Sequence, residues 1–318
     1  MTDSATTDTT GVAGGELWDA VAKGAGEAGW TIRAVPARAV ESAFARARHA
    51  ADAGGFTAGT RSRLTGDLAA CAPPDWGDDA SVVVGAIARP LTRATLTVDG
   101  DEHTVVVPPH YAGYATVPDG LTAAVTAAVA PFGRRAARLE PPLKALAAGS
   151  GLARYGRNSI AYVPGLGSYL MLAACVVGAP PPDDAVWGEP KVLERCSRCS
   201  ACLRACPTGA IRADRFLLDT ERCLTWVNED HDPFPGWVDP AWHTCAVGCL
   251  RCQQVCPENA GVDLVVAPAE VFDEAESAAI LAAASGELTG PTSEKLRRCG
   301  LDYDPRLITR NLHALLAG

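Results

Sequence analysis

The sequence predicts a mixed α/β domain, which is followed by a small cysteine-rich domain and a helical tail. Three observations support this order. Helix-like and strand-like hydrophobic patterns alternate over residues 16–178, nine cysteines crowd into residues 196–256, and the tail is rich in alanine and leucine. We expect five segments: a disordered N-terminus at 1–15, the α/β domain at 16–178, a proline-rich connector at 179–190, the cysteine-rich domain at 191–260 and the helical tail at 261–318.

The elements of the first domain have separate signals in the sequence. Apolar residues at helical spacing predict helices at 16–29, 36–53, 121–130 and 141–152. Runs of β-branched or alternating residues predict strands at 81–88, 94–98, 103–107, 159–163 and 168–177. The pair Asp99-Gly100, which lies between the second and third of these strands, predicts a tight hairpin. In the tail, one helix is expected to open at residues 291–294 and another to span residues 306–316.

The cysteine-rich domain contains two runs with metal-cluster spacing. The first run is C-x2-C-x2-C-x3-C-P, and it extends from Cys196 to Pro207. The second run has two cysteines before its own Cys-Pro pair, and the lone Cys223 precedes it. In runs of this type, three thiolates bind one [4Fe-4S] cluster while the cysteine beside proline binds the other cluster. The pattern therefore predicts a double-cluster domain like that of bacterial ferredoxins, which transfers single electrons.

The cysteines divide into two ligand sets of four. The first set is Cys196, Cys199, Cys202 and Cys256. The second set is Cys206, Cys223, Cys249 and Cys252. Cys245 competes with Cys223 for the last place, although its spacing from Cys249 is not the usual one of two intervening residues. Zinc and disulfides fit this pattern less well, because structural zinc sites use local tetrads and disulfide frameworks belong to small secreted chains.

Composition narrows the class of protein further. The net charge of −9 argues against a strongly basic nucleic-acid surface. No apolar run approaches the length of a membrane span, and no secretory signal pattern opens the chain, so we expect a cytoplasmic protein. Six arginines lie between residues 195 and 222. The sequence leaves three roles open for these arginines. They would tune the cluster potential, bind an acidic electron donor such as flavodoxin or ferredoxin, or form a solvated basic face.

Residues 151–257 resemble the epoxyqueuosine reductase family, which is related to reductive dehalogenases. The shared motifs occur in family order: Tyr155-Gly156-Arg157-Asn158-Ser159, Gly167-Ser168-Tyr169-Leu170, the first cysteine run, the stretch 218–225 around Cys223, and the second run. The resemblance implies a cobalamin-type α/β domain that receives electrons through both clusters. By the same resemblance, the cofactor contacts are Arg157, Asn158, Ser159, Gly167, Ser168 and Tyr169. A tight turn and a buried strand would explain these residues equally well.

Two departures from the family pattern concern the reaction. The family's acidic proton donor falls on Gly178 in this sequence, and glycine cannot transfer a proton. Tyr155, Asp183 and Asp184 are the candidate substitutes. The segment after Cys256 is also shorter than the helical extension of the tRNA-reading members, so tRNA is a disfavoured partner.

Three hypotheses for the function follow from the sequence. The first is a cobalamin-dependent iron–sulfur reductase that acts on a small molecule or a modified nucleoside. The second is a two-cluster electron-transfer protein without catalytic activity of its own. The third is a tRNA epoxyqueuosine reductase in which another acid replaces the missing one.

Overall fold

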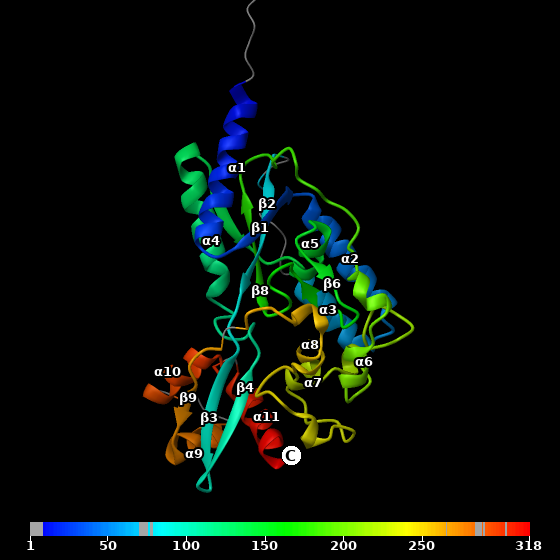
Figure 1. The fold of residues 1–318 in the computed structure, drawn as a ribbon, viewed down its shortest axis with the longest axis vertical. Helices are drawn as coiled ribbons and strands as arrows, with labels where there is room; N and C mark the ends of the chain where they lie inside the picture. Colours follow the sequence, from blue (N-terminus) through cyan, green and yellow to red (C-terminus); the bar gives the residue numbers. More distant parts are fainter. Residues whose placement is uncertain are drawn as a thin grey trace, which may run out of the picture.

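The computed structural model of the chain describes residues 9–69, 76, 79–264, 266–283, 288, 290–302 and 304–318. These residues form two lobes with a cysteine-rich segment between them (Figure 1). We call residues 191–260 the cluster segment. No helix in the described part of the chain has both the length and the apolar character needed to cross a membrane.

The sheet lobe is built on four antiparallel strands. Their order is β1 (Thr31–Pro36), β2 (Ser81–Ala88), β8 (Leu170–Val177) and β5 (Ala136–Leu139). Helices α1 (Thr9–Glu27) and α4 (Val117–Val129) cover one face, while α2 (Ala39–Ala53) and α5 (Leu143–Gly149) cover the other (Figure 1). Helix α3 (Ala58–Ala69) packs beside α2. Alternate residues of β2 and β8 enter the two apolar cores, as the two-residue period of a strand requires.

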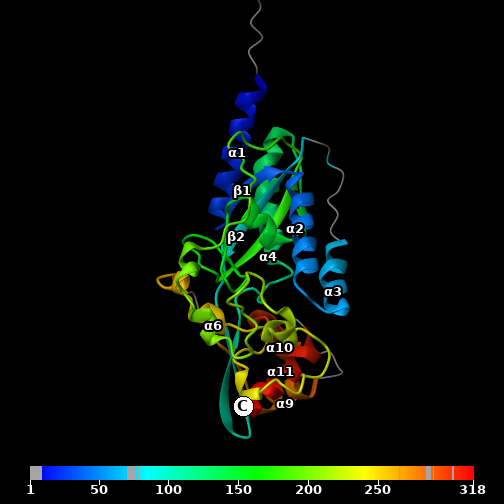
Figure 2. The same ribbon diagram turned by 90° about the vertical axis from the view of Figure 1, so that its right-hand side faces the viewer.

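The hairpin lobe lies at the opposite end of the molecule. Strands β3 (Thr92–Val98) and β4 (Asp101–Val107) form a hairpin, and β9 (Glu270–Phe272) pairs in parallel with β3. Helices α9 (Glu274–Ala282), α10 (Gly290–Cys299) and α11 (Pro305–Ala317) share an apolar core with these strands. Both views show the hairpin and these helices together in the lower half of the molecule (Figures 1 and 2). The hairpin signal is confirmed, because Asp99 and Gly100 both have the positive φ that a tight two-residue turn needs.

The location of the hairpin differs from the sequence-based division of the chain. Residues 92–107 were expected inside the α/β domain, yet their core partners come from the tail. The reason is that a two-stranded hairpin exposes one apolar face and must cover it with another element. The tail is accordingly not an independent helical appendage, since it also contributes the strand β9.

Several element boundaries also differ from the expectations. Helix α1 begins at Thr9, within the segment expected to be disordered, because a packed helix extends at little cost once it is nucleated. Residues 1–8 lie outside the described residues. The strand expected at 159–163 shortens to β7 (Ala161–Tyr162), which pairs with β6 (Arg154–Tyr155). Strands β1 and β5 and helix α3 had no clear signal, since arginines interrupt their apolar patterns.

The cluster segment has little regular structure and is tied to both lobes. It contains the short helices α6 (Ala201–Ala205), α7 (Leu224–Asn228) and α8 (Arg251–Gln254). Toward the hairpin lobe, the Ala246 amide donates to the Val106 carbonyl at 3.0 Å. The buried Asn311 amide donates from α11 to the carbonyls of Asn228 and Ala246. These contacts position the cysteine runs against a rigid frame.

Candidate iron–sulfur centre and interlobe pocket

The first set of four cysteines surrounds one small pocket. Cys196, Cys199, Cys202 and Cys256 all line it, together with residues of the Gly156–Asn158 turn. The Arg157 amide donates to the Cys196 sulfur at 3.4 Å, and its guanidinium donates to the Cys196 carbonyl at 2.6 Å. Burial and the neighbouring thiols raise the pKa of Cys202. Four thiols around one pocket form the donor set that a [4Fe-4S] cluster needs.

The thiols of the second set also lie close enough to one another to affect each other's pKa. The thiol of Cys249 has its pKa raised to about 12, first by burial and then by Cys245, Cys223 and Cys206. Burial likewise raises the pKa of Cys252, with Cys249 and Cys223 nearby. Among the described residues, no group of three or more histidine, cysteine or acidic side chains is arranged for one metal ion. A four-iron cluster holds its thiolates further apart than one ion does.

Cys223 and Cys245 occupy different environments. Cys223 is the N-cap residue of α7, and Cys206 is among the charges that affect its pKa. Cys245 is only 1% exposed and packs in an apolar cluster with Leu91, Tyr169 and Leu250. This contrast supports Cys223 as the eighth ligand, and the assignment stays a prediction until metal analysis tests it.

The predicted cofactor residues contact the cluster segment itself. The Ser168 amide donates to Asn259 Oδ1 at 2.8 Å, and the Ser168 hydroxyl donates to Gln253 Oε1 at 2.9 Å. Asn259 returns a hydrogen bond from Nδ2 to the Ser168 hydroxyl. Gly167 has φ +58, and a Cβ at this position would collide with Asn259 Oδ1. We call Gly167, Ser168, Gln253 and Asn259 the interlobe latch, because they join the sheet lobe to the second cysteine run.

The remaining predicted cofactor residues lie around the same two cysteine sets. Asn158 is 2% exposed and donates to the Tyr162 hydroxyl at 3.0 Å. Ser159 has φ +57, and its carbonyl accepts from Lys144 Nζ at 3.4 Å. Tyr169 packs against Cys245 in the small apolar cluster. The tight turn and the buried strand that the sequence allowed as the simpler explanation are both present.

The candidate proton donors do not meet at one place. Strand β8 carries Gly178 to the far end of the sheet, about 25 Å from the end that contacts the cluster segment. Asp183 and Asp184 follow Gly178 and are exposed. The Tyr155 ring packs edge-on against Phe216 at 5.2 Å, and burial raises its pKa to about 12. The geometry gives no support to Asp183 or Asp184 as proton donors beside the clusters.

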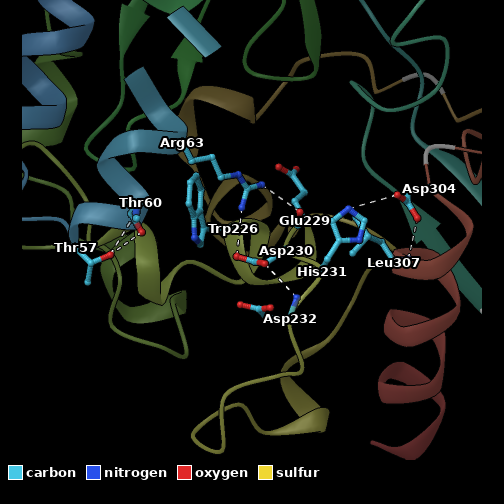
Figure 3. A pocket seen from close by; sticks show the side chains of 11 residues that line it. Thr57, Thr60, Arg63, Trp226, Glu229, Asp230, His231, Asp232, Asp304 and Leu307 are labelled. Atoms are coloured by element: carbon cyan, nitrogen blue, oxygen red, sulfur yellow. Dashed lines mark hydrogen bonds and ion pairs between the residues drawn. The ribbon is translucent and has the colours of Figure 1, made fainter. Parts of the chain in front are cut away.

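A pocket of about 850 Å³ lies between α3 and the end of α7 (Figure 3). This volume is within the range of ligand-binding pockets. The Arg63 guanidinium lies 4.1 Å from the centre of the Trp226 ring and forms an ion pair with Asp230 at 3.3 Å. Across the pocket, His231 faces Asp304 of the hairpin lobe at 3.6 Å (Figure 3). Both lobes and the cluster segment therefore contribute to this interlobe pocket.

Four ionisable side chains near the pocket had no signal in the sequence. Glu229 lines the pocket and accepts a hydrogen bond from the Tyr111 hydroxyl. Lys144 of α5 is exposed, and the desolvation of its amino group lowers its pKa while Cys223 and Glu229 act in the opposite direction. The His110 ring stacks at 4.1 Å on the ring of Tyr111. The adjacent pair His110-Tyr111 is far in the chain from Lys144 and from Glu229, so only the fold brings the pair together with these two residues.

His110 predicts a dependence of stability on pH. Burial, with a contribution from Lys144, lowers its pKa from 6.5 to about 4. Between these values the unfolded chain binds the proton and the folded protein does not, so stability falls as the pH drops from 6.5 to 4. The loss is about 2–3 kcal/mol at most. When the free energy of unfolding is measured in urea at several pH values, H110Q should lose this part of its dependence on pH. The same change at exposed His49 should keep the dependence. An unchanged slope in H110Q would contradict the assignment.

The cluster segment and its surroundings have counterparts in known proteins. Residues 195–259 match the family model described as a 4Fe-4S double cluster binding domain. The epoxyqueuosine reductase of Pseudomonas aeruginosa is 33% identical over 186 residues, which cover 56% of this chain and 50% of that protein. The enzyme of Escherichia coli K12 is 35% identical over 130 residues, which cover 41% of this chain and 32% of that protein. The matched region thus spans half or less of these curated relatives.

Solved structures share the fold over nearly the whole chain. The epoxyqueuosine reductase of Bacillus subtilis is 21% identical, with a TM-score of 0.66 over 96% of this chain and 82% of that chain. A complex of an epoxyqueuosine reductase with an epoxyqueuosine-modified tRNA stem loop is 20% identical, with a TM-score of 0.64 over the same shares. These relatives give no support to the expectation that tRNA is disfavoured. This chain is therefore similar to the epoxyqueuosine reductases in sequence and in fold, and its residues 195–259 match a 4Fe-4S double cluster binding domain.

Proposed function

We propose that this protein is a cobalamin-dependent iron–sulfur reductase. The arrangement of the second cysteine set carries the proposal, because helix α7 runs from Cys223 directly to the wall of the interlobe pocket. Electrons that enter at the exposed side of the first set would pass through both clusters toward this pocket. The external donor would be a low-potential carrier such as flavodoxin or ferredoxin, which the exposed Arg195 and Arg198 would meet.

The residues near the clusters fit a large polar cofactor. Arg157 retains a buried Nε–H that has no partner among the described residues, and this donor suits an amide oxygen of a corrin. Ser159 would add its hydroxyl at the same turn. When bound, cobalamin would supply a strongly reducing cobalt centre beside the clusters. The protein would contribute the exclusion of water, the orientation of the substrate and a proton.

The first substrate to test is an epoxyqueuosine-modified tRNA stem loop, which is the ligand in one related structure. A free modified nucleoside or another small molecule is the alternative. The acidic net charge does not decide between them, because contacts to tRNA depend on the local surface and not on the total.

A two-cluster electron carrier is the second candidate function. The sequence-based alignment of the family's acid with Gly178 motivates it, although Gly178 lies at the end of β8 away from the cluster segment. In this hypothesis the sheet lobe would serve to dock a partner.

Anaerobic reconstitution distinguishes the two candidates. With iron, sulfide and hydroxocobalamin, the reductase hypothesis expects about eight irons per chain and corrinoid absorption that survives desalting. Charge removal in R157Q should weaken corrinoid retention while the iron content stays the same. Eight irons without retained corrinoid would favour the electron carrier.

A further inference from the structure

We propose that the side chains of Asn158 and Tyr162 set the reduction potentials of the two clusters through hydrogen bonds to their cysteine ligands. Both residues belong to the β6–β7 hairpin, which we define as residues 154–162. The proposal rests on the two clusters, which both candidate functions require, and on the two ligand sets. It adds two residues of the sheet lobe to the path of the electrons.

The turn of the β6–β7 hairpin is closed by its own backbone. The Gly156 amide donates to the Ile160 carbonyl at 2.8 Å, and the Ser159 amide donates to the Gly156 carbonyl at 2.9 Å. A Cβ at Gly156 would collide with Asn158 Oδ1 and with the Tyr162 ring, so the missing side chain lets both pack closely. Asn158 is 2% exposed and Tyr162 is 3% exposed. The hairpin therefore holds both polar groups in one place, away from solvent.

A chain of hydrogen bonds joins the two cysteine sets through this pair. Asn158 Nδ2 donates to the Tyr162 hydroxyl at 3.0 Å, and that hydroxyl donates to the Cys256 sulfur. The Asn158 side chain also donates to the Cys252 sulfur. An amide group has two hydrogens to donate and a phenol has one, so each donor of the pair has an acceptor. Cys256 belongs to the first set and Cys252 to the second, so one chain of hydrogen bonds reaches both.

Cys252 and Cys256 are also the ligands at which the two sets interlock. Cys252 lies in α8, and Cys256 follows that helix after about one helical turn. Cys256 lines the pocket of the first set, and Asn158 lines the same pocket. An electron that moves from the first cluster to the second would therefore pass this pair.

Hydrogen bonds to the ligand sulfurs act on the charge of a cluster. The reduced cluster carries one more negative charge than the oxidised cluster, so a donor stabilises the reduced form and raises the reduction potential. Buried surroundings with a low dielectric constant strengthen this effect. Members of a hydrogen-bonded chain also polarise one another, so a change at Asn158 should reach Cys256 through Tyr162. The pair thus raises both potentials.

Tyr162→Phe removes one donor and keeps the ring. We expect the midpoint potential of one cluster to fall while that of the other stays at the wild-type value. The one-electron reduction equilibrium should shift about tenfold, which corresponds to about 59 mV. The first cluster should still assemble, because the Arg157 amide remains a donor to the Cys196 sulfur. A reductive titration of the reconstituted protein, followed by electron paramagnetic resonance, measures both potentials, and metal analysis measures the iron.

Asn158→Leu removes the donors to both sets with little change in volume. Both midpoint potentials should fall, because the amide donates to Cys252 directly and polarises the Tyr162 hydroxyl. One shifted potential against two is a pattern that does not depend on which signal belongs to which cluster. Tyr155→Phe is the matched control, because Tyr155 belongs to the same hairpin but its ring packs against Phe216. Both potentials should stay at the wild-type values in this control.

The outcomes decide the proposal independently of the reductase activity. Unchanged potentials in Y162F and N158L, with the full iron content, would overturn it. Loss of iron from both variants would overturn it as well, because the pair would then hold the cysteine runs in place instead of tuning the clusters. If only one variant loses iron, the potentials of the other decide. The titration contains neither cobalamin nor substrate, so a failure to retain corrinoid would contradict the reductase and leave this result unaffected.

Discussion

Replacing Cys223 with serine is expected to halve the iron content, from about eight to about four atoms per chain. Cys223 precedes α7 and lies near Cys206. Its charge contributes to the raised pKa of both Cys249 and Cys252. A serine hydroxyl is a far weaker ligand for iron than a thiolate, so the second cluster should not assemble. The first cluster should persist, because its four cysteines line a separate pocket. Metal analysis and electron paramagnetic resonance of the reduced protein measure both effects.

Cys245→Ser is the matched control for this experiment. Cys245 lies four residues before Cys249 of the second run, but its side chain packs in an apolar cluster. The variant should retain about eight irons, although burial of a hydroxyl without a full set of partners costs about 1–3 kcal/mol of stability. Four irons in C245S together with eight in C223S would reverse the assignment.

Gly167→Ala is expected to destabilise the protein strongly. The left-handed backbone at φ +58 costs an alanine about 1–2 kcal/mol. The new Cβ would also collide with Asn259 Oδ1 and displace the acceptor of the Ser168 amide. Loss of these buried hydrogen bonds adds about 2–3 kcal/mol. Thermal unfolding of the reconstituted protein should show a large drop in the melting temperature.

Gly165→Ala separates backbone strain from the collision. Gly165 also has a positive φ, of +80, but no atom of the described residues beyond its chain neighbours lies within 4 Å of the place that a Cβ would occupy. The melting temperature of the G165A variant should fall by less than half as much as that of the G167A variant. Equal losses at the two glycines would mean that the latch adds nothing to stability.

Local sequence patterns predicted the elements whose conformation depends only on neighbouring residues. The hairpin at Asp99-Gly100 and the buried strand at 81–88 are present because turn geometry and continuous β-branched runs act over a few residues. The mixed helix and sheet architecture and the double-cluster domain are likewise confirmed. The roles of the individual cysteines and the cobalamin contacts stay predictions.

Long-range pairing could not be predicted from those signals. The hairpin at residues 92–107 packs with the tail because both expose apolar faces, and nothing local indicates which partner each face takes. The same holds for Glu229 and Tyr111, which are 118 residues apart. Strand β5 was missed because arginines at 135 and 138 mask its short apolar pattern.

The chain leaves the sheet lobe after β2, returns to it after β4 and leaves it again after residues 179–190, which pack on the lobe through Ala179 and Trp187. Two domains on a single linker rotate freely about one flexible joint. In this protein, a hinge motion that opens the interlobe pocket must bend three backbone segments together. The hydrogen bonds of the interlobe latch resist this opening as well. Large-amplitude closure is therefore disfavoured, and ligands should enter a cleft whose walls already stand near their final separation.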